Sequence, residues 1–181
     1  MPFRYNEGMD RRLRKTEEAI QNALIELVSK NGYENIRMVD VIEKADINKS
    51  TFYLHHQSLL GVSFAIEDKI VTSVLDILSG AALTDEGIIM QILESIRTNR
   101  KAWQTVLSVS EGHFYKKMEV SLDHYLSDLV ENKLDKETSK YTKASLFGSL
   151  FGAIRSYALG SNRSDIKKCE QVISNILNIS N

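Results

Sequence analysis

The segment from Val39 to His56, VDVIEKADINKSTFYLHH, constrains the fold of this chain more than any other stretch. In its first half, Val41, Ile42 and Ala45 recur at helical spacing and would form the apolar face of a short helix. Asn48 can cap a second helix, because its side chain can accept a hydrogen bond from an N–H of the first turn. The pattern therefore predicts two short helices set at an angle and joined by a tight turn.

The second of these helices has one inward side and one polar side. Phe52 and His56 fall one turn apart, so both are expected to face inward. A cation, two hydroxyls, a phenol and an imidazole remain available to a partner, on Lys49, Ser50, Thr51, Tyr53 and His55. Such a helix suits the phosphates and base edges of a DNA major groove. The segment thus predicts a helix-turn-helix motif.

Each polar side chain of this helix has an expected role at DNA. Lys49 and His55 would donate hydrogen bonds to phosphates or guanine edges, and Thr51 and Tyr53 would bind the DNA backbone. Ser50 is small enough to let the helix enter the groove. The alternative is a hydrated surface helix without a nucleic-acid partner.

A longer helix precedes this motif, in the stretch TEEAIQNALIELVSKNGYENI from Thr16 to Ile36. Together the two stretches resemble the N-terminal domain of TetR-type transcriptional regulators, whose recognition-helix signature is echoed by NKSTFYLHH. The resemblance covers about the first third of the chain. It implies a DNA-binding role for Lys49, Thr51, Tyr53 and His55, and a dimer formed through the last two helices.

Five positions depart from the family pattern. A hydroxyl and a basic residue commonly open the first helix of the motif, and a glycine, an aromatic residue and a lysine are common further on. This chain instead has Met38, Val39, Asp46, His56 and Leu59 at these positions. The changes weaken phosphate contacts, so a co-regulator that acts through protein partners is a second hypothesis. Co-activators of dihydroxyacetone kinase operons have a similarly short C-terminal domain.

Charge sets the expected strength of DNA binding. The net charge of the chain is -1, and residues 1–57 carry nine Lys or Arg and nine Asp or Glu. Local basic groups remain, in the cluster at residues 11–15 and at Arg37, which would add a phosphate contact. We therefore expect modest, salt-dependent affinity for double-stranded DNA.

Composition excludes several other classes of protein. The apolar content of 43% is enough for a packed core, yet no apolar run is long enough to cross a bilayer. The first residues lack the apolar middle of a signal peptide, which predicts a cytoplasmic protein with no membrane partner. Cys169 is the single cysteine, so an internal disulfide and a multi-cysteine metal site are excluded.

No catalytic set is evident. Glu111, His113 and His124 form the nearest approach to a cluster, but they point in different directions on a helix and provide too few ligands for a metal. Glycine-rich phosphate loops and nucleophile motifs are absent from the sequence. We predict no enzyme, no cofactor and no metal.

The predicted fold is all-α, with about nine helices. One proline and no lasting period-two pattern favour uninterrupted helices. A three-helix helix-turn-helix domain would occupy residues 1–57, and a helical-bundle domain for dimerisation and possible ligand binding would occupy residues 58–181. The helix after the motif is expected at residues 59–79, and a hydroxyl with two acids at residues 84–86 predicts the next helix start.

The larger domain offers candidates for a ligand pocket. Large apolar and aromatic side chains could line a cavity for a small apolar effector, with an indole and a phenol as polar handles. The candidate lining residues are Phe64, Ile96, Trp103, Leu107, Phe114, Met118, Tyr125 and Phe151. The alternative is that these residues are ordinary core.

The last two helices are candidates for a homodimer interface. One carries bulky residues beside glycines at intervals of four, which allow another helix to approach closely. Both helices could pair with their copies as a four-helix bundle. The candidate interface residues are Phe147, Gly148, Phe151, Gly152, Ile154, Ile173 and Ile176. Alternatively, the two helices merely close the core of one protomer.

Overall fold

The computed structural model describes residues 11–85, 87–130, 134–160 and 165–179. These residues contain nine α-helices, one 3-10 turn and no strand, which confirms the predicted all-α class. No helix among them is both long and apolar enough to cross a membrane.

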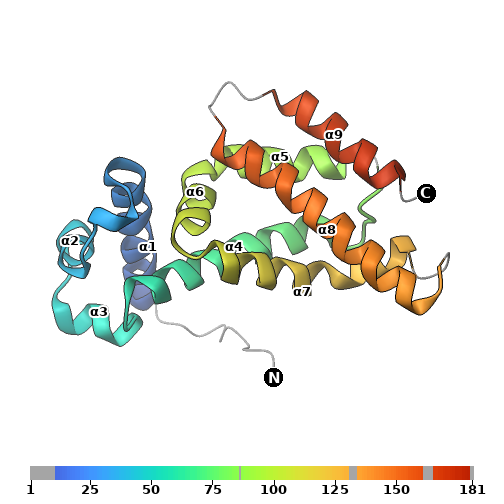
Figure 1. Cartoon of the computed structure of the whole chain (residues 1–181). Helices are drawn as coiled ribbons and strands as arrows, with labels where there is room; N and C mark the ends of the chain where they lie inside the picture. Colours follow the sequence, from blue (N-terminus) through green and yellow to red (C-terminus); the bar gives the residue numbers. More distant parts are fainter. Residues whose placement is uncertain (1–10, 86, 131–133, 161–164, 180–181) are drawn as a thin grey trace.

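The N-terminal part consists of three helices and a short turn (Figure 1). Their bounds are α1 Arg11–Asn31, the 3-10 turn Tyr33–Asn35, α2 Met38–Lys44 and α3 Lys49–His55. Ile20 and Leu24 of α1 are fully buried, as are Val41 of α2 and Phe52 of α3, so the three helices share one core. The first helix begins at Arg11 rather than at Thr16, which places the basic cluster at residues 11–15 on its first turns.

Six further helices form the larger part, with α4 as the link between the two (Figure 1). They are α4 Leu59–Leu78, α5 Ile88–Thr98, α6 Arg100–Val109, α7 Glu111–Val130, α8 Lys136–Leu159 and α9 Ile166–Ile179. Helix α1 packs against both α4 and α6. A continuous apolar core consequently runs from Ile20 in α1 to Leu177 in α9.

The predicted helix start at residues 84–86 is wrong. Asp85 accepts a hydrogen bond from the Ala82 N–H at 2.9 Å and so closes a turn, and Glu86 lies outside the described residues. Helix α5 begins only at Ile88, because Gly87 has a left-handed backbone with φ of 80°. The Asp85 side chain therefore stabilises a turn before the helix and not the first turn of the helix itself.

The turn between α2 and α3 contains a strained residue. Asp46 has φ of 53°, in the left-handed region that glycine adopts without steric cost. Asp46→Gly is therefore expected to raise the free energy of unfolding by about 1 kcal/mol, the relief of strain being partly offset by a more flexible unfolded chain. Urea unfolding followed by circular dichroism measures this change. Asp46→Ala keeps the strain and serves as the control, and an equal effect of both substitutions would contradict the explanation.

Candidate nucleic-acid interface and cavity

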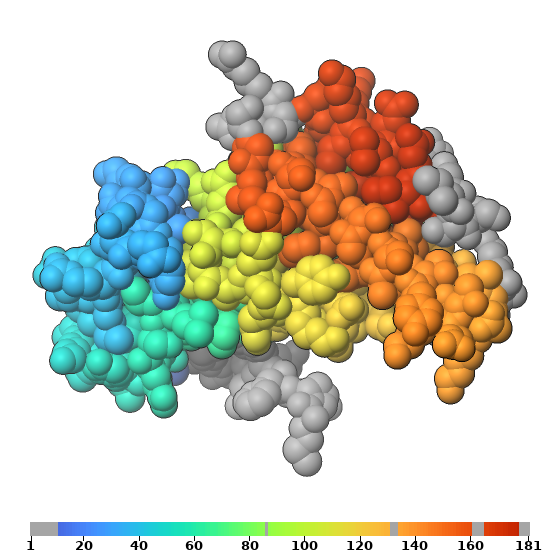
Figure 2. Space-filling view, in the orientation of Figure 1, coloured from blue at the N-terminus to red at the C-terminus, as the bar shows by residue number. Residues whose placement is uncertain are grey.

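Helix α3 presents its polar side to solvent at one end of the molecule (Figure 2). The Asn48 side chain accepts a hydrogen bond from the Thr51 N–H at 2.8 Å, so the predicted N-cap is confirmed. Lys49, Ser50 and Tyr53 are exposed, and Thr51 is half-buried. The Lys49 ammonium lies 5.9 Å from the centre of the Tyr53 ring. Four of the predicted DNA contacts therefore share one face or its edge.

Arg37 caps α2 and is also exposed. Its guanidinium lies 3.4 Å from the Asp40 carboxylate, and its backbone N–H donates to the same carboxylate at 2.7 Å. The backbone hydrogen bond and the guanidinium together lower the pKa of Asp40. A phosphate at Arg37 would thus compete with a local carboxylate, while Val39 beside it exposes only an apolar surface.

The expectation that His55 is available to a partner is not met. Its Nδ1 lies 2.9 Å from Glu17 Oε2, and Nε2 of His56 lies 2.8 Å from Glu17 Oε1. Both imidazole side chains are only 9% exposed. One carboxylate of α1 therefore fixes the end of α3. The predicted inward position of His56 is confirmed, and so is that of Phe52, which is fully buried.

Glu17 was missed by the sequence analysis, although it controls the position of two histidines. Burial by itself would raise the pKa of its carboxyl group, but the hydrogen bonds and charge of His56, with bonds from Gln21 and His55, lower that pKa to about 2. The carboxylate is therefore charged throughout the physiological range. Glu17 and His55 are 38 positions apart in the sequence, so no local pattern pointed to the pair.

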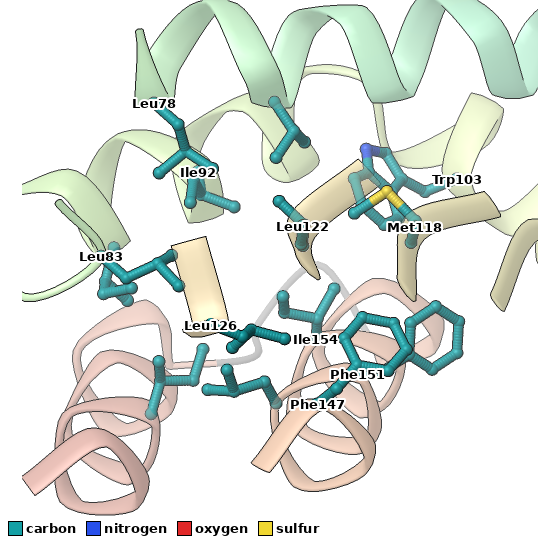
Figure 3. A pocket seen from close by; sticks show the side chains of 14 residues that line it. Leu78, Leu83, Ile92, Trp103, Met118, Leu122, Leu126, Phe147, Phe151 and Ile154 are labelled. Carbon is teal, nitrogen blue, oxygen red and sulfur yellow. The ribbon is translucent and has the colours of Figure 1, made fainter. Parts of the chain in front are cut away.

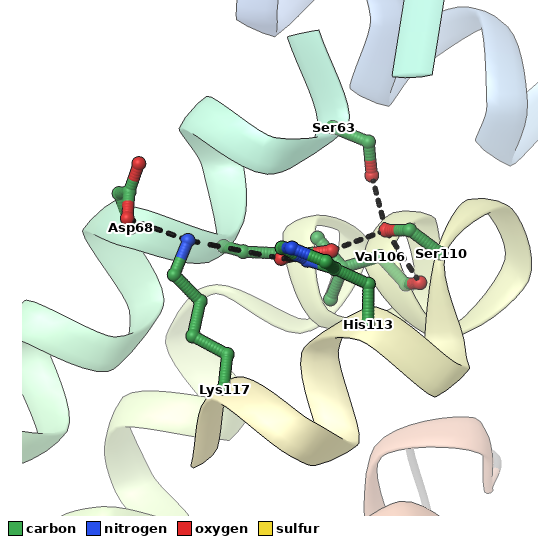
Figure 4. A network of polar contacts seen from close by, with 7 residues as sticks. Ser63, Asp68, Val106, Ser110, His113 and Lys117 are labelled. Atoms are coloured by element: carbon green, nitrogen blue, oxygen red, sulfur yellow. Dashed lines mark hydrogen bonds and ion pairs between the residues drawn. The ribbon is translucent and has the colours of Figure 1, made fainter. Parts of the chain in front are cut away.

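A polar network around a buried carboxylate joins α4 to the end of α6 and to α7 (Figure 4). Glu67 is fully buried and accepts a hydrogen bond from Ser110 Oγ, which lies 2.8 Å from Ser63 Oγ. The other carboxylate oxygen lies 2.6 Å from His113 Nδ1 and 3.9 Å from Lys117 Nζ. The network therefore links α4, which directly follows the helix-turn-helix motif, to α7 and to the end of α6.

The three residues considered for a metal or catalytic cluster have separate partners. Glu111 pairs with the Arg155 guanidinium, and His113 belongs to the Glu67 network. His124 is exposed, with Nε2 3.8 Å from Asp128. The structure therefore brings no two of the three together as one site.

A small, largely enclosed cavity of about 40 Å³ lies in the larger part (Figure 3). Of the predicted lining residues, Trp103, Met118 and Phe151 do line it. The other predicted residues do not, namely Phe64, Ile96, Leu107, Phe114 and Tyr125. Phe64 instead stacks on the His113 ring with centroids 4.0 Å apart, and Ile96 and Phe114 are fully buried in the core.

The rest of the cavity wall comes from α4, α5, α7, α8 and α9 and from one loop residue. Sequence periodicity cannot show which apolar side chains leave space between them. The additional lining residues are Val74, Leu78, Leu83, Ile89, Ile92, Leu122, Leu126, Phe147, Leu150, Ile154 and Ile173. All of these are apolar, and beside them Trp103 carries the one N–H group of the lining side chains, so the cavity offers mainly apolar contact.

The candidate dimer residues divide between the inside and the outside of the protomer. Phe147, Phe151 and Ile173 are buried, so their assignment to a surface is wrong, and Ile154 also lines the cavity. The aromatic rings of α8 face α7, with the Tyr115 ring centred 4.9 Å from the rings of both Phe147 and Phe151. The other side of α8 is consequently the one that faces outward.

An open groove lies between α8 and α9 on this outward side. Small residues line it on α8, and Val172 and the half-buried Ile176 line it on α9. Gly152 is exposed there with no atom within 4 Å of an added Cβ, whereas Gly148 approaches the Tyr115 hydroxyl. Tyr157 also lines the groove, and its buried hydroxyl has no hydrogen-bond partner among the described residues.

The order and packing of the nine described helices are those of the TetR-type transcriptional regulators. Among solved structures, a TetR regulator from Streptococcus agalactiae 2603V matches with a TM-score of 0.70 and 21% identity, over 94% of this chain and 96% of that chain. The dihydroxyacetone kinase operon activator DhaS matches with a TM-score of 0.65 and 19% identity, over 91% of this chain and 95% of that chain.

Similarity in sequence is more limited. YvdT of Bacillus subtilis (strain 168), an uncharacterized HTH-type transcriptional regulator, is 33% identical over 69 residues. This match spans 38% of the present chain and 36% of YvdT. No protein-family model matches the sequence.

Proposed function

We propose that this protein is a cytoplasmic, homodimeric transcriptional regulator that binds double-stranded DNA through α3 and responds to a small apolar effector. The observation that carries the proposal is the outer face of α3, where Lys49, Ser50 and Tyr53 are exposed in a fold shared with transcriptional regulators. A cation beside a phenol and a hydroxyl can bind phosphates and base edges together. The role is regulatory and not catalytic.

The groove between α8 and α9 supports the dimer. Its small residues let a partner helix approach closely, and the buried Tyr157 hydroxyl would gain a hydrogen-bond partner or an ordered water there. A twofold pair of this kind buries the same groove on both subunits. The two α3 helices must then lie about 34–36 Å apart, or a multiple of that distance, to enter successive major grooves.

Helix α4 supports a route from effector to DNA. It starts directly after the helix-turn-helix motif, and its Val74 and Leu78 line the cavity. A ligand larger than the present cavity has to move such side chains, and a state with a wider cavity would have a different spacing of the α3 helices. The effector changes DNA affinity by its differential affinity for the two states and by no more.

The test is the double substitution Lys49→Ala with Tyr53→Ala. Duplexes selected from a random library by the parent protein are expected to bind the variant about a hundredfold more weakly or worse, because two contacts at the DNA surface are lost. Fluorescence anisotropy at a fixed salt concentration measures the affinity, and sedimentation checks the dimer. The matched control is Lys140→Ala with Tyr141→Ala, an exposed pair on α8. Equal binding by the parent and the variant would contradict the site.

A co-regulator without DNA binding is the second candidate. It is supported by the Arg37–Asp40 pair, the Glu17–His55 pair and the half-buried Leu59, each of which removes or weakens a phosphate contact. This candidate predicts that selection from random duplexes enriches no sequence. It also predicts that the protein shows no salt-sensitive binding to DNA.

A further inference from the structure

Leu54, in the last turn of α3, is the most exposed large apolar side chain of the described residues. It is 82% exposed, whereas Phe52, two residues before it, is fully buried. A leucine left in water forgoes the favourable free energy of burying its apolar side chain. The side chain contributes nothing to the core, so a partner surface is the place where its burial would be favourable.

The residues around Leu54 indicate the chemistry of that partner surface. Ser50 lies one turn before it, Tyr53 precedes it and Gln57 lies three residues beyond, and all three are exposed. A protein partner that recognises an apolar hot spot usually covers a contiguous patch of roughly 1,000 Å² or more. A single apolar side chain among hydroxyl, phenol and amide groups matches a small apolar group that is set in a polar surface.

The 5-methyl group of thymine in the major groove is such a group. We infer that Leu54 contacts a thymine methyl and makes this protein specific for an A·T pair opposite the end of α3. The inference rests on the proposed DNA binding and deepens it. Two basic residues near the motif are already paired with carboxylates, Lys44 with Glu26 at 2.7 Å and Arg37 with Asp40. Apolar contacts therefore carry a larger share of the affinity.

The experiment removes the methyl group from the DNA and the side chain from the protein. In duplexes selected by the parent protein, each thymine is replaced singly by deoxyuridine, which keeps base pairing and deletes only the methyl. At one position in each half-site the parent is expected to bind about fourfold more weakly. Leu54→Ala is expected to bind both forms of that duplex equally.

Leu134→Ala is the matched control, because Leu134 is 40% exposed and comes just before α8, whose first turns lie far from α3 (Figure 1). It should keep the sensitivity of the parent to methyl removal. Circular dichroism checks that Leu54→Ala is folded, which the exposure of the side chain leads us to expect.

Two results would overturn the inference while the proposed function stands. One is a selected duplex that the parent binds equally with thymine or deoxyuridine at every position. The other is methyl sensitivity that persists in Leu54→Ala, since another residue would then contact the methyl. Failure to select any duplex would overturn the DNA-binding function and this inference together.

Discussion

His113→Phe combined with Lys117→Met is expected to lower the free energy of unfolding by about 3 kcal/mol near neutral pH, because it leaves the Glu67 carboxylate buried without a cation. The phenyl ring retains the stacking on Phe64, and methionine retains most of the apolar stem of the lysine.

Urea unfolding followed by circular dichroism near neutral pH measures this effect. Adding Glu67→Gln to the double variant removes the buried charge and is expected to recover most of the lost stability. A loss that Glu67→Gln fails to recover would show that packing and not charge accounts for the effect. Such a result would mean that the side chains of the network stabilise the fold through their packing and not through their charges.

Glu17→Gln is expected to lower the free energy of unfolding by about 2 kcal/mol at pH 7, through the loss of the charged bonds to His55 and His56. The folded-state pKa of Glu17 is depressed from 4.5 to about 2. The contribution of its carboxylate is therefore fully present above the unfolded pKa and is lost as the pH falls from about 4.5 to 2. Over this window the stability of the parent should fall toward that of the variant.

The measurement compares unfolding midpoints of both proteins across this pH range. Glu18→Gln is the control, since Glu18 is adjacent in the sequence and exposed, and it is expected to change stability by less than about 0.5 kcal/mol. A constant difference between Glu17→Gln and the parent from pH 7 to pH 2 would contradict a charged contact. Glu17 fixes the end of α3 through His55 and His56. The DNA affinity of Glu17→Gln therefore also tests whether α3 needs these contacts to bind DNA.

Local patterns predicted the helices and the turn of the motif correctly. The spacing of Val41 and Phe52 and the capping side chain of Asn48 act within a few residues, and the structure agrees with each of them. The same reasoning failed at Thr84, because one left-handed glycine outweighed a favourable capping sequence. Short-range rules are reliable where all the local signals agree.

The sites depended on contacts that the sequence does not display. Periodicity identified Phe147, Phe151 and Ile173 as apolar faces, but it could not say whether those faces meet a second subunit or the protomer itself. Likewise, the small volume of the cavity depends on how side chains from α4 to α9 interlock, to which each helix contributes a few atoms.

The sequence by itself determined that the chain is helical, that two short helices meet at a tight turn and that Lys49, Ser50 and Tyr53 lie on the outer face of the second. These features follow from hydrophobic spacing and capping over one or two turns. Only the tertiary structure decided that Glu17 holds His55 and that Glu67 is buried beneath His113. Both pairings join residues at least 38 positions apart, and their geometry exists only once the helices have packed.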